Sequence, residues 1–190
     1  MRRTIALLLS VVVVVVSGCA QEASPDEIGS VTTASRTSSE GTREIFRDPQ
    51  RTYTIELGRD WRELPGTLVE EIEAWQVGAT EDGFTPNVNV LTQAAPGLDL
   101  QEYVDLSGES GEDLGGYEVI DLSIVDGAHG QLGVMDYTSR QGSHDLHHLG
   151  VFAVADDRAI VATLTAPEAV FDALREEVWP YLLTLQNIER

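Results

Sequence analysis

The chain has 190 residues, of which 42% are hydrophobic, and its 32 acidic against 12 basic side chains give a formal net charge of −20. Such a surface is repelled by phosphate backbones, which argues against a nucleic-acid-binding protein. Cys19 is the only cysteine, so there is no internal disulfide and, once Cys19 is modified, no thiolate metal site or cysteine nucleophile.

The first 18 residues have the form of a secretory signal peptide, with Arg2 and Arg3 before an apolar run over residues 4–16. A membrane span takes roughly 20 apolar residues, so this run is short for one. The Val-Ser-Gly sequence before Cys19 resembles the lipobox of bacterial lipoproteins. The resemblance implies cleavage before Cys19, a diacylglycerol thioether on its sulfur, and anchoring at the outer face of the cytoplasmic membrane.

Residues 19–42 are rich in Ser, Thr, Gly and acids, and they predict a flexible tether behind the lipidated cysteine. A random coil of this length spans on average roughly 25–30 Å. One compact globular domain is therefore expected over residues 43–190, close to the envelope surface.

Alternation of apolar and polar side chains predicts the first strands of this domain. The expected elements are a strand at 53–57, a turn at 58–60 leading to Trp61, a strand at 70–78, a turn at 81–83 and a strand at 87–92. The last strand alternates Asn with Val, which predicts burial on one face only.

A change of period at Asp99 predicts a short helix, because Asp99 followed by Glu102 has the spacing of a capping box. The glycine-rich residues 108–116 are expected to end this helix and to form a flexible connection. Longer strands follow at 117–125, 130–139, 145–155 and 158–164, with turns at 126–127 and 140–143 and a tight hairpin at Asp156-Asp157.

A second amphipathic helix closes the chain. Thr165 and Glu168 have capping-box spacing, with Pro167 in the first turn, and Pro180 is expected to kink or end the helix near Trp179. The apolar stripe comprises Val170, Phe171, Leu174, Val178, Leu182 and Leu185. Runs of strands with helices laid on them predict an α+β domain built on an antiparallel sheet.

This order of elements resembles the LpqN/LpqT group of actinobacterial lipoproteins, which is similar in turn to the PsbP-like fold. Trp61 after the first strand and the Phe-x-Pro-Asn-Val sequence of residues 84–88 carry the resemblance, although Gly58 stands near the place of a family proline. It implies an αβα sandwich, a mostly antiparallel sheet covered by a short helix and the C-terminal helix. It transfers no catalytic residues. We expect Trp61 and Phe84 to be core aromatics.

Three of the four histidines fall within residues 143–148. On a strand His144 and His148 share one face roughly 13 Å apart, too far to bind one zinc ion directly, while His147 points to the other face. His129, His144 and His148 remain the candidate metal ligands. Ser143, His144 and Asp145 are consecutive, so they do not form a catalytic triad, and we assign no catalytic residue.

The favoured hypothesis is a lipid-anchored, non-enzymatic envelope protein without a cofactor, whose domain binds or scaffolds another envelope component. Its expected partners are the membrane, through Cys19, and an envelope protein or lipid; the expected binding surface is an exposed sheet face or residues 108–116 acting as a flap. One alternative is a carrier of a small apolar molecule or lipid in a cavity between sheet and helices. Another is an enzyme that uses His144 or His148. The ligand-binding residues are left unassigned.

Overall fold

A computed structural model describes residues 44–50, 52–64, 72–113 and 116–188 of the chain. The predicted signal peptide, Cys19 and the tether lie outside these residues. No helix in the described part of the chain is long and apolar enough to cross a membrane.

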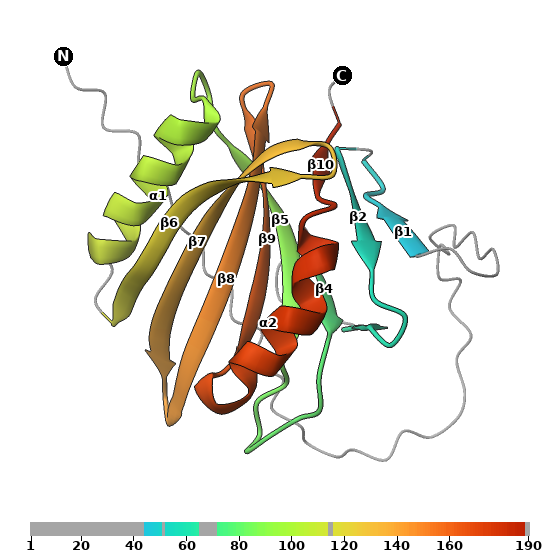
Figure 1. The fold of residues 1–190 in the computed structure, drawn as a ribbon, viewed down its shortest axis with the longest axis vertical. Coiled ribbons are helices and arrows are strands. Elements are labelled where there is room, and N and C mark those ends of the chain that lie inside the picture. Colours follow the sequence, from blue (N-terminus) through green and yellow to red (C-terminus); the bar gives the residue numbers. More distant parts are fainter. Residues whose placement is uncertain (1–43, 51, 65–71, 114–115, 189–190) are drawn as a thin grey trace, which may run out of the picture.

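The fold is built around one large antiparallel sheet of seven strands, in the order β3-β4-β5-β9-β8-β7-β6 (Figure 1). Its strands are β3 (Arg62–Glu63), β4 (Ile72–Gln76), β5 (Asn87–Ala94), β6 (Tyr117–Gly127), β7 (Gly130–Gln141), β8 (His144–Ala155) and β9 (Arg158–Pro167). A second, three-stranded sheet has the order β1-β2-β10 and consists of β1 (Glu44–Arg47), β2 (Tyr53–Leu57) and β10 (Gln186–Asn187).

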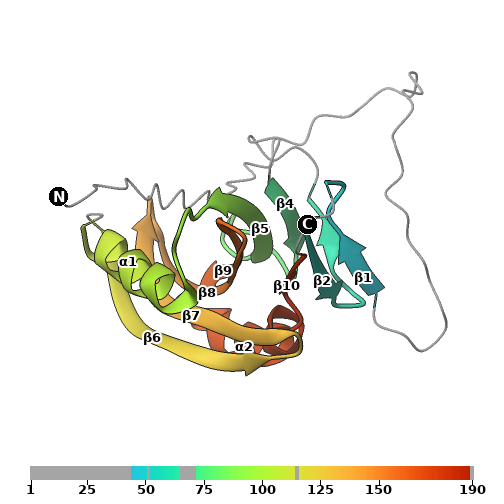
Figure 2. The same ribbon diagram turned by 90° about the horizontal axis from the view of Figure 1, so that it is seen from above.

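Two helices cover opposite faces of the large sheet (Figures 1 and 2). Helix α1 (Leu100–Asp113) packs on β6, β7 and β8, and helix α2 (Glu168–Leu182) packs on β8 and β9 beside β2. The tip of the β6–β7 hairpin reaches across to the end of α2, where the Ala128 amide donates to the Leu183 carbonyl. This confirms the predicted α+β class with helices on both sides of an antiparallel sheet.

Alternating side chains of the central strands fill two separate hydrophobic cores. The α2 core joins α2, the large sheet and β2, and includes Tyr53, Ile55, Val88, Leu149, Ile160, Phe171, Val178 and Leu182. The α1 core lies on the opposite face and comprises Ala95, Tyr103, Val104, Met135, Tyr137, Phe152, Ala159 and Val161. Because each central strand contributes to both cores, the middle of the sheet is buried on both faces.

The strand predictions are largely confirmed, with two corrections. Asp156 and Asp157 both have positive φ (52° and 60°), as a tight primed turn requires. The turn expected at 126–127 is displaced, because β6 runs to Gly127 and the chain reverses at Ala128 and His129. The prediction that residues 87–92 bury one face is wrong for the first half of β5, where residues 87–90 are all buried.

Residues 108–116 are not a flexible flap where the structure describes them, because α1 continues to Asp113. The capping box is confirmed: the Glu102 amide donates to the Asp99 carboxylate, and the Asp99 amide donates to the Glu102 carboxylate. Gly108 lies inside this helix, where a Cβ would overlap the end of the Leu122 side chain of β6. The glycine thus permits a close approach of Leu122 to the helix, although its helix propensity is low.

The start and end of α2 also differ from expectation. No side chain caps the N-terminus, because β9 continues to Pro167 and the Thr165 hydroxyl contacts His148 instead. Pro180 does not end the helix near Trp179, since α2 continues to Leu182, whose side chain is fully buried. The predicted apolar stripe packs in the α2 core as expected.

The two aromatic landmarks have different surroundings. Phe84 is buried, as predicted, whereas Trp61 is half-buried at the rim of the α2 core, with its ring 5.4 Å from that of Tyr181. The indole lies directly against Gly58, where any Cβ would overlap it. Gly58 therefore makes room for Trp61.

Candidate functional site

The alternation of β8 sends its neighbouring histidines to opposite faces of the sheet. His147 stacks on Phe171 of α2, with ring centroids 3.7 Å apart, and His148 stacks on Tyr137 on the α1 side at 4.5 Å. His144 lies at the start of β8 with its ring 5.8 Å from that of Phe84. The predicted division of faces is therefore correct.

His148 is fully buried between two hydroxyl groups. Its Nε2 lies 2.7 Å from the Ser139 hydroxyl oxygen, and its Nδ1 lies 3.0 Å from the Thr165 hydroxyl oxygen. Burial, with a smaller contribution from His147, lowers the pKa of His148 to about 3. A neutral imidazole donates one of these hydrogen bonds and accepts the other, so it links β7, β8 and β9.

The Ser139–His148 pair has the donor–acceptor arrangement of a nucleophile and its base, but its chemistry is unsuited to catalysis. A general base works best with a pKa near the operating pH, and His148 lies several units below that. Its orienting partner is a threonine hydroxyl rather than a carboxylate, which gives an imidazolium no charge stabilisation. We interpret the trio as a satisfied polar group within the sheet.

Protonation of His148 makes stability depend on pH. The unfolded chain binds a proton at this residue below about pH 6.5, whereas the folded chain does not until about pH 3, so stability falls as the pH falls between these values. We expect this residue alone to lower the free energy of unfolding by about 2 kcal/mol from pH 7 to pH 5. Urea unfolding of the full-length protein at both pH values measures the loss, which His148→Gln should remove. An equal loss in the variant would contradict this assignment.

A second polar cluster fastens α2 to the sheet. Asp136 of β7 contacts His147 Nε2 through Oδ1 at 2.5 Å and Arg175 of α2 through Oδ2 at 3.3 Å. The carboxylate is buried, with 9% of its side chain exposed. Asp136 thus receives the two partners that a buried carboxylate needs.

The sequence analysis did not identify the role of Asp136, although the position of this carboxylate among inward-facing apolar residues indicated one. Asp136 lies on the same inward face of β7 as Leu132 and Val134. A carboxylate at such a position is expected to need a cationic or hydrogen-bonding partner. The partner itself is not visible in the sequence, because His147 lies diagonally across the β7–β8 pair.

The three candidate metal ligands lie at separate places. His129 is exposed in the β6–β7 turn, His144 stands at the start of β8 beside Phe84, and both ring nitrogens of His148 already face hydroxyls. The described residues contain no group of three His, Cys, Asp or Glu side chains that could hold a metal ion.

Two of the hollows that described residues line open on the surface, and neither of these two lies in an apolar space between sheet and helix. One, of about 470 Å³, is lined by residues that include Glu118, Arg140, Asp145 and Glu168. The other, of about 430 Å³, lies beside His129, Gln131 and Asn187. Under α1 the space is filled, because a Cβ on Gly133 would overlap Val104 and press on Phe152.

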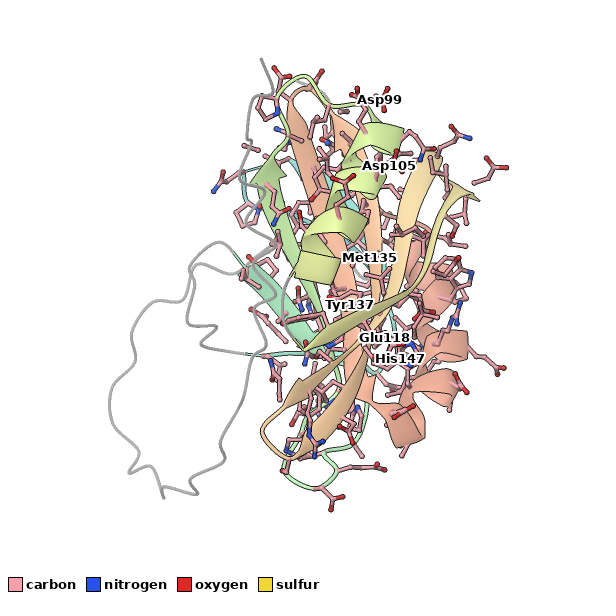
Figure 3. The ribbon with its side chains drawn as sticks, turned by 90° about the vertical axis from the view of Figure 1, so that its left-hand side faces the viewer. Asp99, Asp105, Glu118, Met135, Tyr137 and His147 are labelled. Carbon is pink, nitrogen blue, oxygen red and sulfur yellow. The ribbon has the colours of Figure 1, made fainter. Side chains whose placement is uncertain are left out.

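The outer edge of β6 combines an open sheet edge with exposed apolar side chains. β6 ends the order of the large sheet and has β7 as its single strand partner among the described residues. The exposed large hydrophobic residues of the described chain are Ile45, Ile120 and Leu122, so two of three are on this strand. Figure 3 views this side of the molecule, with Asp105 marking α1, Glu118 marking β6, and Met135 and Tyr137 on the neighbouring β7.

Comparisons with known proteins show the fold. No family model and no curated protein matches the chain. A Pseudomonas aeruginosa protein of unknown function described as a putative regulator matches with TM-score 0.54 and 18% identity over 79% of this chain and 99% of its own. Cyanobacterial PsbP from Synechocystis matches with TM-score 0.53 and 14% identity, over 86% of this chain and 98% of its own. LpqN of Mycobacterium tuberculosis matches with TM-score 0.54 and 11% identity, over 72% of this chain and 83% of its own. That protein is described as involved in cell envelope biogenesis.

These similarities support the PsbP-like fold that the sequence predicted. At 9 to 18% identity they do not assign the chain to a sequence family.

Proposed function

We propose that the chain is a lipid-anchored, non-enzymatic protein of the cell envelope, whose exported domain binds another envelope component through its outer surface. The signal-like leader, the lipobox-like end at Cys19 and the Ser/Thr-rich segment up to residue 42 support the anchor. The domain is held close to the outer face of the cytoplasmic membrane, where the partner also lies.

The observation that carries the binding role is the contrast between a filled interior and an exposed edge. Side chains pack both sheet–helix interfaces, and the buried His148 and Asp136 have their partners inside the fold. Ile120 of β6 is 55% exposed, and Leu122 is 37% exposed. These two side chains give the open edge of the sheet an apolar surface that a partner strand can cover.

The fold of LpqN supports the envelope location, because that protein is described as involved in cell envelope biogenesis. A relationship of this chain to the LpqN/LpqT group is part of the proposal. We do not favour the carrier hypothesis, because the close contacts of Gly133 under α1 leave no room there for an apolar ligand. We also do not favour an enzyme that uses His148 as its base, because burial makes this imidazole a weak base.

The anchor is tested by Cys19→Ala. The thiol is the acceptor of the lipid, so we expect loss of palmitate labelling and either release of the protein or accumulation of the uncleaved precursor. Metabolic labelling and membrane fractionation measure both effects, with Ser17→Ala as a control that keeps the thiol. Persistent labelling of the Cys19→Ala chain would contradict a lipid anchor at this residue.

The binding role is tested by photocrosslinking in living cells. A photoreactive amino acid is placed at exposed positions on different elements, in place of Asp82, Glu109, Asp126, Asp156 and Glu177. We expect a discrete adduct with one envelope component from one position or from neighbouring positions. No adduct at any position, beyond those of an unrelated domain on the same anchor, would contradict the proposal.

A further inference from the structure

Among the described residues the outer edge of β6 has no strand partner, so it offers backbone groups to another strand. In an antiparallel pair alternate residues turn their N–H and C=O groups away from the neighbour, so every second residue of an edge strand presents both groups outward. β6 has 11 residues, and from Asp121 to Gly127 its register with β7 is unbroken. This stretch is long enough and regular enough to template one more strand.

A β-bulge separates this regular stretch from the start of the strand. Val119 pairs with Tyr137 and Asp121 with Asp136, which leaves Ile120 as the extra residue without a partner on β7. Ile120 and Leu122 are both exposed beside the open edge. An added strand therefore gains apolar contacts at one end of the stretch as well as backbone hydrogen bonds along it.

The charge around the edge selects the chemistry of the added strand. From Leu100 to Gly127, α1, the link after it and β6 contain no arginine or lysine. Their acidic residues whose side chains the structure describes are Glu102, Asp105, Glu109, Glu118, Asp121 and Asp126. Asp121 and Asp126 are exposed within the regular stretch itself. A segment that carries Lys or Arg is attracted to this edge, and an acidic segment is repelled.

Charge also argues against the two candidate strands that the chain itself could provide. A second copy pairing through β6 would bring two sets of carboxylates into one sheet, and like charges across paired strands are destabilising. The tether, residues 21–42, carries Glu22, Asp26, Glu27 and Glu40 against the single Arg36, so it is acidic too. The occupant is therefore a strand from a different chain.

We propose that the outer edge of β6, from Asp121 to Gly127, pairs with an extended basic segment of an envelope protein partner, adding a strand to the large sheet. Backbone hydrogen bonds to β6 and contacts with Ile120 and Leu122 provide affinity, and the carboxylates provide selection for Lys and Arg. This inference rests on the proposed binding role and names the surface and the partner for it.

The test uses the full-length lipidated protein in nanodiscs of neutral phosphatidylcholine and a capped nine-residue peptide of alternating lysine and valine. We expect saturable binding and none of the glutamate analogue. The double variant Asp121→Lys with Asp126→Lys should weaken binding about tenfold or more, because each substitution turns an attraction for the lysines of the peptide into a repulsion. Asp172→Lys with Glu176→Lys, on the exposed face of α2, changes the net charge equally and is the matched control.

N-methylated peptides separate strand pairing from charge attraction alone. A second lysine–valine peptide is methylated on every backbone amide, so it keeps the charges but cannot donate a hydrogen bond to β6 from either of its edges. If the peptide pairs with β6, this methylated peptide loses binding. Equal binding of the methylated and unmethylated peptides, equal weakening by the two charge variants, or no saturable binding of the lysine peptide would overturn the proposal.

The crosslinking scan distinguishes this inference from the proposed function. An envelope adduct at Asp82, Asp156 or Glu177 but not at Asp126, together with failure of the peptide, overturns the β6 surface and leaves the binding role standing. Absence of adducts at every position overturns the binding role itself, whatever the peptide does.

Discussion

Replacing Phe171 by Ala is expected to lower the free energy of unfolding by about 3–5 kcal/mol. Phe171 is fully buried in α2 at the centre of the α2 core, and its ring forms the stacking surface for His147. The substitution leaves a cavity, and it also removes the apolar contact that holds His147 near Asp136. Chemical denaturation of the full-length protein measures the loss.

Asp172→Ala is the control for this substitution, because Asp172 is exposed on the same helix turn. A change within about 0.5 kcal/mol is expected there. A loss below about 1 kcal/mol for Phe171→Ala would contradict the close packing of α2 on the sheet.

Gly133→Val is expected to cost about 3 kcal/mol, because it adds carbon atoms to an interface that has no room for them. A Cβ at this position would overlap Val104 of α1 and come within 3.1 Å of Phe152 and 3.3 Å of Leu100. The side chain of Val104 cannot move aside easily, because a β-branched residue in a helix has one strongly preferred rotamer. Helix α1 must therefore shift away from the sheet.

A double-mutant cycle with Val104→Ala tests the origin of this loss. Removing the two methyl groups of Val104 makes space for the new side chain, so the double variant should be more stable than the sum of the single effects predicts. Additive losses, or a Gly133→Val protein as stable as the wild type, would mean that α1 does not pack closely on the sheet at Gly133. A cavity for an apolar ligand would then be possible there, as the carrier hypothesis requires.

The secondary structure was predictable from local pattern where hydrophobic period and turn chemistry agree. The Asp156-Asp157 hairpin and the Asp99–Glu102 cap depend on neighbouring residues alone, and both are as predicted. The continuation of α1 through Gly108 was not predictable in this way. Glycine has a low helix propensity, and the contact of Leu122 with Gly108, from 14 positions away, exists only in the folded chain.

The surroundings of the histidines show the same limit. The period of a strand places His147 and His148 on opposite faces, and the sequence predicted this correctly. The predicted Asp156-Asp157 hairpin also sets the register that places Thr165 opposite His148. The contact with Ser139 was not predictable from the strand period, because Ser139 lies diagonally across the β7–β8 pair. Nor could the sequence predict that β6 would be an edge, since strand order is a property of the whole sheet.

Hydrogen–deuterium exchange of the anchored protein tests the central claim most directly. Exchange is compared between the protein in isolated envelopes, with its partner present, and the same protein purified in neutral nanodiscs. Strand addition predicts slower exchange in envelopes at alternate amides of β6 between Asp121 and Gly127, with α2 unchanged. Unchanged exchange along β6, together with new protection on another surface, would contradict it.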